Sequence, residues 1–407
     1  MANSAFWLKN VRLEKGYYIE DDHVSGTITE VCHIKIEDGR FASIVPEETE
    51  LNDNLDKYNT KELLMLPSFK EMHIHIDKTY YGGPWKAIKP AKSILDKFAE
   101  EKELLPKLLP TARDRAEKIL ETILGFGSTH VRTHCNIDPA IGLSNLEATN
   151  LALDAFTGKM TSEIVAFPQH GLLRSNMVEQ VRQALKQGAT IVGGVDPFSV
   201  DNNLEKSLNT MVELAVEANA GIDIHLHERD AIGLKTMNLL ADLTEEASLQ
   251  GKVTVSHAFG FAEESKIAAS ELADRFAKLG IAVTSTVPIG NIIMPLPMLR
   301  EKGVKVELGT DSLTDHWSPF GNGDNLEKVG RLAELYRHVD EVALAQSLAY
   351  ITGGITPLDK DGNREWPQVG DHANIVLVDS SCSAEAVARR AAKRVVLFNG
   401  KFVSGEI

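Results

Sequence analysis

The middle of the chain alternates short apolar runs with longer segments of helical periodicity. Continuous apolar runs are typical of parallel strands that are buried on both faces. In one intervening segment Met177, Val181 and Ala184 form an apolar stripe, which predicts a helix capped by Asn176 and ended by Gly188. The eight runs are Leu64–Ile76, Thr129–Thr133, Glu163–Phe167, Thr190–Gly194, Gly221–His225, Lys252–Ser256, Gly280–Thr284 and Val304–Leu308.

This eightfold alternation of strand and helix predicts an α/β protein with a (β/α)₈ TIM barrel. An open doubly wound sheet is the alternative fold. The G-x-G-x-x-G loop that would follow its first strand is absent. We therefore predict that residues 67–356 form a closed barrel.

Both ends of the chain carry shorter strands separated by turn signals. Asn399-Gly400 between two apolar runs is a strong hairpin signal. Because the two ends share this character, we expect residues 1–66 and 357–407 to form one small β-sandwich domain. The predicted strands of this domain are Phe6–Leu8, Val24–Val31, His33–Ile36, Ala373–Asp379, Arg394–Phe398 and Lys401–Val403.

Histidines and one aspartate stand at the C-terminal ends of the predicted barrel strands, the face on which barrel enzymes build their active sites. His73 and His75 end the first strand, and alternation points both to one side. His225, His257 and Asp311 end the fifth, sixth and eighth strands. A lone buried histidine is more often a core residue, but chance would scatter such residues over both barrel faces. Imidazoles and a carboxylate suit a divalent ion such as Zn²⁺ or Fe²⁺.

The charge of the chain narrows the range of partners. A formal net charge of −15 disfavours binding to nucleic acid or to an anionic membrane, because a protein needs a basic surface to bind either of them.

The location of the protein is indicated by other features. No apolar stretch approaches the roughly 18 residues of a membrane span, and the first residues do not resemble a secretory signal. Cys32, Cys135 and Cys382 are few and far apart, which is typical of a reducing compartment. We expect a cytoplasmic protein that acts on a small molecule.

Together these motifs resemble the amidohydrolase superfamily. His73-Ile-His75, Ser256-His257 and Gly309-Thr310-Asp311 occur in the order expected of it, between two chain ends that form a small β-domain. The resemblance spans nearly the whole chain and implies a homo-oligomer. Four further segments resemble the cytosine deaminase branch: Val131–His134, Val165–Gln169, His225–Glu228 and Asp315–Gly321.

The resemblance implies a role for each of several residues. Glu228 would move protons between the activated water and a ring nitrogen, although an ion pair with Arg229 is the alternative. His257 would hydrogen-bond the attacking water or the developing oxyanion. Gln169 would bind the amide-like edge of the substrate, and Trp317 would form part of the pocket wall. The implied metal ligands are His73, His75, His225 and Asp311, of which Asp311 could also accept the proton of the water.

The resemblance also implies a single metal ion. Members with two ions bridge them by a modified lysine at the end of the fourth strand, where this chain has no lysine in Val192–Pro197. Asp196 is then available to contact substrate, although Asp-Pro is also an ordinary turn.

The chain departs from cytosine deaminases around the expected substrate. Ser312 stands where they have a second aspartate, and His227 replaces an acidic residue. Asp77-Lys78 and Phe320–Asp324 are more similar to aminohydrolases of s-triazine rings, the N-isopropylammelide hydrolases among them. Lys78 is either a contact for a carbonyl-rich or anionic ring or a solvated lysine. The segment that follows, around Trp85, is either a lid or an exposed loop.

We therefore expect a metal-dependent aminohydrolase that replaces an exocyclic amine of a pyrimidine, triazine or pterin-like ring with oxygen. Two alternatives stay open: a cyclic amide hydrolase with the same metal site, and a catalytically silent barrel that binds a metal or senses a ligand. A sugar-phosphate isomerase or aldolase is disfavoured by the acidic barrel mouth. The P-C-x-x-C signature of zinc nucleoside deaminases is absent.

Overall fold

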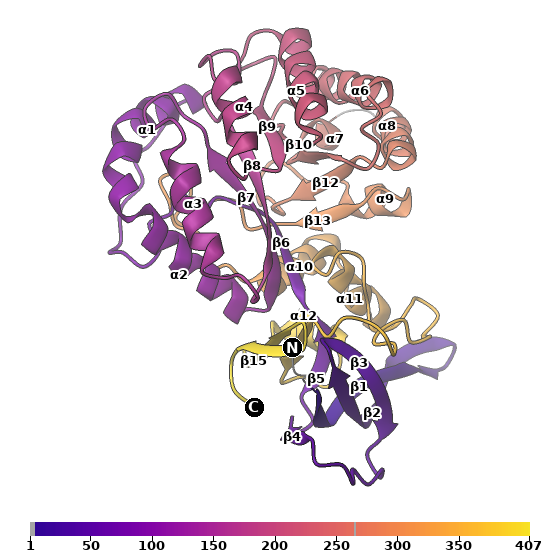
Figure 1. Ribbon diagram of the computed structural model, residues 1–407. Helices are drawn as coiled ribbons and strands as arrows, with labels where there is room; N and C mark the ends of the chain where they lie inside the picture. The colour runs from indigo at the N-terminus through magenta and orange to yellow at the C-terminus, as the bar shows by residue number, and fades with distance from the viewer. Residues whose placement is uncertain (1–4, 264–265) are drawn as a thin grey trace.

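The computed structural model describes residues 5–263 and 266–407. Eight parallel strands follow one another around a nearly closed barrel (Figure 1). The first and last strands meet at a seam, where Asp311 N donates to His73 O at 2.7 Å and Ile74 pairs with Asp311. The predicted TIM barrel is confirmed. Its strands are β6 (Phe69–Ile74), β7 (Ser128–Asn136), β8 (Thr161–Phe167), β9 (Ile191–Val195), β10 (Gly221–His225), β11 (Val253–Ser256), β12 (Ala282–Ser285) and β13 (Val306–Leu308).

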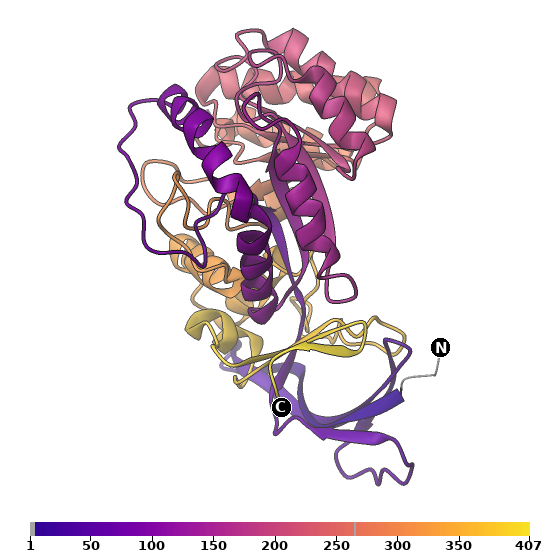
Figure 2. The ribbon, with the colours of Figure 1, turned by 60° about the vertical axis from the view of Figure 1, so that its left-hand side comes forward.

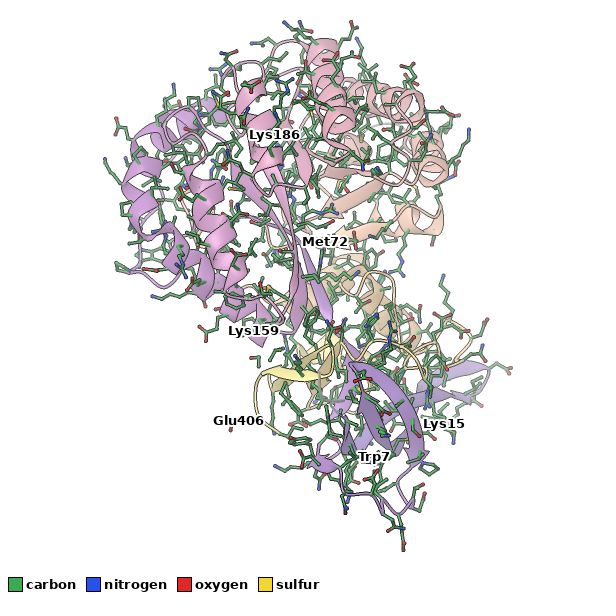
Figure 3. The ribbon with its side chains drawn as sticks, in the orientation of Figure 1. Trp7, Lys15, Met72, Lys159, Lys186 and Glu406 are labelled. Carbon is green, nitrogen blue, oxygen red and sulfur yellow. The ribbon has the colours of Figure 1, made fainter. Side chains whose placement is uncertain are left out.

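Helices connect these strands and cover the outside of the barrel (Figure 1). Lys186, in the last turn of α4, points outward, whereas Met72 of β6 is buried (Figure 3). The barrel region contains α1 (Ile94–Leu108), η1 (Leu109–Thr111), α2 (Ala112–Gly125), α3 (Ser144–Asp154), α4 (Val178–Lys186), α5 (Leu204–Ala218), α6 (Asp230–Glu246), α7 (Gly260–Glu263), α8 (Lys266–Leu279), α9 (Leu296–Glu301), α10 (Asn325–Tyr336), α11 (Glu341–Ser347) and η2 (Leu348–Tyr350).

The two chain ends build a second sheet, in the order β16-β15-β14-β5-β1-β2-β3 with β4 beside β1. The sheet is bent, so that its C-terminal strands lie across from its N-terminal strands (Figure 2). Side chains from both halves, such as Ile34 and Leu377, share one core, as in a sandwich. The elements are β1 (Ala5–Glu20), β2 (His23–Glu37), β3 (Arg40–Pro46), β4 (Asp56–Asn59), β5 (Leu64–Pro67), β14 (Ile375–Val378), α12 (Ser383–Arg389), β15 (Arg394–Phe398) and β16 (Lys401–Ser404).

Several boundaries differ from the prediction, and three of the differences change how an element is understood. The apolar run Leu64–Ile76 is two strands, because the chain leaves the second sheet after β5 and enters the barrel as β6. The two predicted strands within 24–36 are one continuous strand, β2. Asn176 does not cap α4: it has a φ of 56°, and Met177 precedes the first helical residue without a side-chain cap. Among the described residues, no helix combines the length and apolar character needed to cross a membrane.

Candidate metal centre and substrate pocket

Four side chains converge at the C-terminal end of the barrel. One ligand atom from each of His73, His75, His225 and Asp311 lies within 4.8 Å of the others. Asp311 Oδ1 is 3.4 Å from His73 Nε2 and 3.3 Å from His75 Nε2, and His225 Nε2 is 3.3 Å from His75 Nε2. The strands β6 and β10 and the residues after β13 therefore bring the predicted ligand set together.

Hydrogen bonds fix which nitrogen of two imidazoles carries the proton. His75 Nδ1 lies 3.2 Å from the carbonyl oxygen of His134, which can only accept, so Nδ1 donates. His73 Nδ1 lies 2.9 Å from Ser256 Oγ, which itself donates to Asp223 Oδ1 at 2.7 Å. Ser256 Oγ therefore accepts from His73 Nδ1. In both rings the lone pair is left on Nε2, facing Asp311.

The protonation of these groups suits a cation. Burial lowers the pKa of His75 to about 3 and holds the pKa of His225 well below its usual value, so both rings are neutral. Burial alone would raise the pKa of Asp311, but the neighbouring rings of His73 and His75 hold it well below the usual value. His73 Nε2 is buried and has no hydrogen-bond partner among the described residues. Neutral imidazoles and one carboxylate fit a divalent ion of the Zn²⁺ or Fe²⁺ type.

The seam of the barrel holds this group in place. Glu71 Oε1 accepts hydrogen bonds from His73 N at 3.1 Å and Thr310 N at 2.9 Å, which ties β6 to the residues after β13. A Cβ on Gly309 would lie 2.4 Å from His73 Cβ, so only glycine allows this close approach. Burial raises the pKa of Glu71 to about 7.

His257 lies beside the four predicted ligands. It follows β11 with a φ of 69°, and its Nε2 is 4.0 Å from Asp311 Oδ2. This nitrogen is buried and has no hydrogen-bond partner in the described part of the chain. Burial holds the pKa of His257 well below its usual value, so the ring is neutral. The imidazole can therefore form a hydrogen bond with a molecule next to Asp311.

Glu228 has a different environment from the one its predicted role suggests. Its Oε1 accepts from Phe198 N at 2.8 Å and Ser199 N at 2.9 Å, and its Oε2 accepts from Thr236 Oγ1 at 2.7 Å. These partners belong to the loop after β9 and to α6. Burial raises the pKa of this carboxyl. The bonds hold Glu228 at the rim, next to His227.

Asp196 and His227 form a pair at the same rim. Asp196 Oδ2 is 2.8 Å from His227 Nδ1, and Asp196 Oδ1 accepts from His227 N at 2.6 Å. Burial would lower the pKa of His227, but the Asp196 carboxylate outweighs it and raises the pKa. The ring of His227 lies 4.4 Å from that of His257, centroid to centroid. Asp196 therefore orients the loop after β10.

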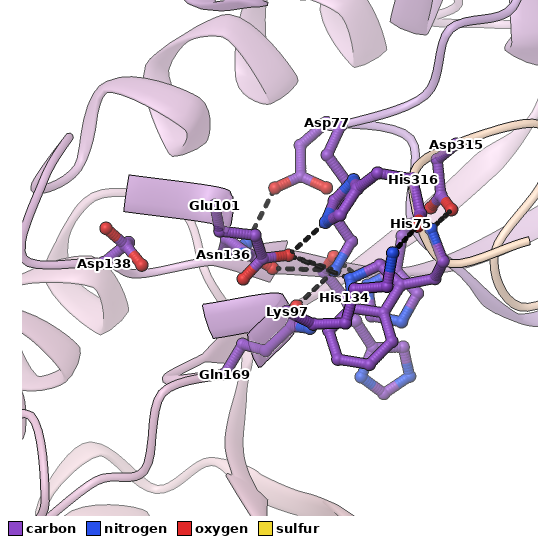
Figure 4. A network of polar contacts seen from close by, with 12 residues as sticks. His75, Asp77, Lys97, Glu101, His134, Asn136, Asp138, Gln169, Asp315 and His316 are labelled. Carbon is purple, nitrogen blue, oxygen red and sulfur yellow. Dashed lines mark hydrogen bonds and ion pairs between the residues drawn. The ribbon is translucent and has the colours of Figure 1, made fainter. Parts of the chain in front are cut away.

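Lys78 is the centre of a second polar group in the barrel mouth, and Figure 4 shows three members of this group, Glu101, Asn136 and Gln169. It is 1% exposed, so it is not a solvated lysine. Its Nζ donates to Gln169 Oε1 and, at 3.4 Å, to Asn136 Oδ1. Nζ is also 3.6 Å from Glu101 Oε1 and 5.6 Å from the ring centre of Trp317. The predicted substrate contacts Lys78, Gln169 and Trp317 are thus neighbours.

Asp77 and Ser312 take separate positions. Asp77 Oδ2 accepts from Asn136 N and from Asn145 Nδ2, both at 2.8 Å, and burial raises the pKa of the carboxyl. Asp77 therefore anchors the loop after β6 to β7 and α3. Ser312 lines a cavity of about 760 Å³ that includes Asp311. Apolar side chains of this cavity are Val287, Pro288, Ile289 and Phe320.

Several buried polar residues of the mouth carry no recognisable motif. Glu101 and Lys97 lie on α1, and Asp138 and His170 follow β7 and β8. His316 stands inside a segment that the sequence already marks, and His170 directly follows Gln169. For Glu101 the only signal is its place one turn after Phe98, on the buried face of an amphipathic helix. Trp85, in the loop before α1, is 73% exposed.

Known proteins are similar to this chain over nearly its whole length. YahJ, an uncharacterised protein of Escherichia coli (strain K12), is 43% identical over 405 residues, which are 99% of this chain and 88% of that protein. N-isopropylammelide isopropyl amidohydrolase of Pseudomonas sp. (strain ADP) is 28% identical, over 86% of this chain and 88% of that protein.

A solved structure extends the similarity to the fold. The crystal structure of N-isopropylammelide isopropylaminohydrolase from Burkholderia multivorans ATCC 17616 superposes with a TM-score of 0.86 at 28% identity, over 99% of this chain and 98% of that one. Residues 104–404 match the amidohydrolase family. Since that match spans most of the barrel and the C-terminal strands, the chain belongs to the amidohydrolase family.

Proposed function

We propose that the protein is a metal-dependent aminohydrolase that removes an exocyclic amine from a planar nitrogen heterocycle. The observation that carries this proposal is the convergence of three imidazoles and Asp311 within 4.8 Å, beside the buried polar group around Lys78. The similarity to N-isopropylammelide isopropyl amidohydrolases supports it. The reaction adds the oxygen of water to the ring carbon and breaks its bond to the amine. One hydrogen of the water ends on the ring nitrogen and the other on the departing amine.

His73, His75, His225 and Asp311 would hold one divalent ion, Zn²⁺ or Fe²⁺. Such an ion lowers the pKa of a bound water from 15.7 to about 7. Asp311 Oδ2 and His257 Nε2, 4.0 Å apart, would orient the attacking water and accept its proton.

Glu228 would deliver the proton to the ring or the amine. The raised pKa of its carboxyl keeps more of it protonated near neutral pH, as a proton donor requires. Its carboxyl would have to turn from Thr236 and Ser199 toward the substrate, a rotation of one side chain.

The ring itself would lie between Asp311 and Lys78. Gln169 accepts from Lys78 through Oε1, which leaves its amide NH₂ to donate to a ring oxygen. Trp317 would form a wall of this pocket, and Ser312 and His227 would line its rim. Donors in this position favour rings that carry carbonyl groups, such as oxo-pyrimidines, oxo-triazines and pterins.

Amine release by the metal-loaded protein tests the proposal. The panel contains cytosine, isocytosine, methylated cytosines, aminotriazines, pterins and creatinine, and metal content is measured on the same sample. We expect ammonia or alkylamine from one class of ring, and loss of that release when a chelator removes the ion.

Two results would contradict the proposal. Release that survives complete metal removal would exclude the metal-dependent mechanism. No release from protein with one full metal equivalent would favour the opening of a cyclic amide by the same site, which ring-opening assays on hydantoins and dihydropyrimidines then test. A protein inactive in both assays would be a silent binder.

A further inference from the structure

Glu101 is a fully buried carboxylate that α1 inserts into the barrel mouth. Its helix is firmly placed: a capping box between Ser93 and Asp96 begins it, and Phe98 packs against Phe167 and Val195. Glu101 lies one turn beyond Phe98 on the same face. The helix therefore presents this carboxylate to the loops around the proposed substrate pocket.

Three barrel loops meet at this one carboxylate, and Figure 4 shows Glu101 beside His316 of one of them. Oε1 accepts from His316 Nε2 at 2.8 Å and from Trp317 Nε1 at 2.9 Å, both in the loop after β13. The same oxygen is 3.6 Å from Nζ of Lys78, in the loop after β6. Oε2 is 2.8 Å from Nε2 of His170, in the loop after β8. None of these residues belongs to the proposed ligand set.

Glu101 is the counter-ion of Lys78. Lys78 also acts to lower the pKa of Asp77 and Asp315, but burial outweighs it and raises the pKa of both. Burial would also raise the pKa of Glu101, but Lys78 and its hydrogen bonds with His170 and His316 hold that pKa well below the usual value. Among the described acidic residues, only Glu101 lies within 4 Å of Lys78 Nζ.

His170 is a second positive group beside Glu101, and it also contacts a second carboxylate. Its Nε2 faces Glu101 and its Nδ1 lies 2.8 Å from Asp138 Oδ2, so both ring nitrogens point at carboxylates. Burial would lower the pKa of this ring, but the two carboxylates raise it to about 8. Two positive groups, Lys78 and His170, therefore lie against two carboxylates, Glu101 and Asp138, and their charges balance. Removal of the charge of Glu101 would leave an excess positive charge in a dry pocket.

We infer that Glu101 is a positioning residue of the substrate pocket: it fixes Lys78 and Trp317 and cancels the charge of Lys78, so that the pocket prefers a neutral ring to an anionic one. This inference rests on the proposed function, which assigns substrate contacts to Lys78 and Trp317. Without Glu101 the ammonium would be free to pair with an anionic ring, and the indole would lose its hydrogen-bond acceptor.

Calorimetric binding of two planar rings to the metal-loaded full chain tests the inference. Uracil is neutral at neutral pH, whereas barbiturate has a similar shape and one negative charge. We expect the wild type to bind uracil more tightly. In Glu101→Gln the ratio of the two dissociation constants should shift toward barbiturate by about tenfold or more, the equivalent of one pKa unit of differential interaction.

Three further variants separate charge from structure. Glu101→Asp keeps the charge and should keep the wild-type preference. Glu100→Gln removes a charge from the same helix at a residue that pairs with Lys97, 3.1 Å away, and should change nothing. Lys78→Met with Glu101→Gln removes both members of the buried pair and should abolish the shift, which also guards against misfolding of the single variant.

An unchanged ratio in folded Glu101→Gln would overturn the inference. So would a wild type that binds barbiturate as tightly as uracil, or that binds neither ring. Amine release from the substrate panel reports on the proposed function separately, because it does not depend on this ratio. A protein that releases amine but shows no charge preference would retain the function and lose the inference.

Discussion

Two of the imidazoles at the metal centre, His73 and His75, are prepared for a cation by the protein around them. His73 donates to Ser256, which donates to Asp223, and Asp223 pairs with Arg132 at 3.0 Å. Such outer partners set the tautomer and the orientation of a ligand ring. The lone pairs on Nε2 are therefore directed at one point before any ion binds.

Loss of a ligand should lower the metal content of the purified protein. We expect His225→Ala and Asp311→Ala to weaken metal binding by more than the roughly 10–100-fold that loss of an outer partner causes. Elemental analysis after dialysis measures the ion per chain. His338→Ala is the control, since His338 follows α10 and contacts Ser347, away from the four proposed ligands. Unchanged metal content in both ligand variants would contradict the assignment.

Glu228→Gln should separate metal binding from turnover. The amide keeps the size of the side chain and can still accept from Phe198 and Ser199, but it cannot transfer a proton. We expect a full metal equivalent and a fall in kcat of roughly 10²–10⁴. Steady-state rates with the substrate identified in the panel measure this fall, and wild-type turnover would exclude Glu228 as the proton carrier.

Residues at strand ends were predictable, whereas residues that act through distant contacts were not. His73, His75, His225 and Asp311 each follow an apolar run, and the barrel places all such ends on one face. Glu101 meets its partner His316 across 215 positions of the sequence. A pattern of neighbours along the chain contains no information about such a pair.

At the scale of elements, one predicted strand is wrong because the chain passes from one sheet to the other within it. The run Leu64–Ile76 looks like one strand in the sequence, because nearly all residues of both β5 and β6 are buried. Only the change of partner, from β14 to β7, divides it. The pattern of burial therefore predicts that a strand exists, and pairing decides where it ends.

The contact between β1 and α12 gives the stability of the protein a dependence on pH. Glu14, on β1, is 3% exposed and accepts from Ser383 N at the start of α12, and burial raises its pKa to about 7. An acid whose pKa is raised in the folded state stabilises it most below pH 4.5, and this contribution is lost as the pH rises through 7.

Glu14→Gln should remove this dependence. Relative to the variant, the wild type should lose about 3 kcal/mol of unfolding free energy between pH 4.5 and a pH above 7. Urea unfolding of both proteins across that range measures the difference. A difference that stays constant with pH would show that Glu14 titrates normally in the folded chain.

At the scale of the whole molecule, one buried ion pair fastens the barrel to the second sheet. Arg394, on β15, binds both oxygens of Asp324, at 2.6 and 2.7 Å. Asp324 also caps α10 by accepting from Leu326 N. The pair therefore joins the last helical layer of the barrel to a strand from the C-terminal end.

Arg394→Met should lower the free energy of unfolding of the whole protein. The variant leaves Asp324 buried without its partner, which costs about 3–5 kcal/mol. Chemical denaturation measures the loss. Arg113→Met removes an exposed ion pair with Glu117 and should leave the free energy of unfolding unchanged. Equal stability of the two variants would show that the pair does not fasten the two sheets.

The position of the seam also determines when, during synthesis of the chain, the proposed metal site can be completed. Glu71 and Thr310, which the seam joins, stand 239 positions apart, and the proposed ligands His73 and Asp311 lie beside them. At about 5–20 residues per second, a ribosome needs on the order of 10–50 s to make the intervening chain. The first two ligands therefore leave the ribosome long before the last one exists. Metal loading would consequently be an event of the finished chain, and the metal pool present at that moment would decide which ion it receives.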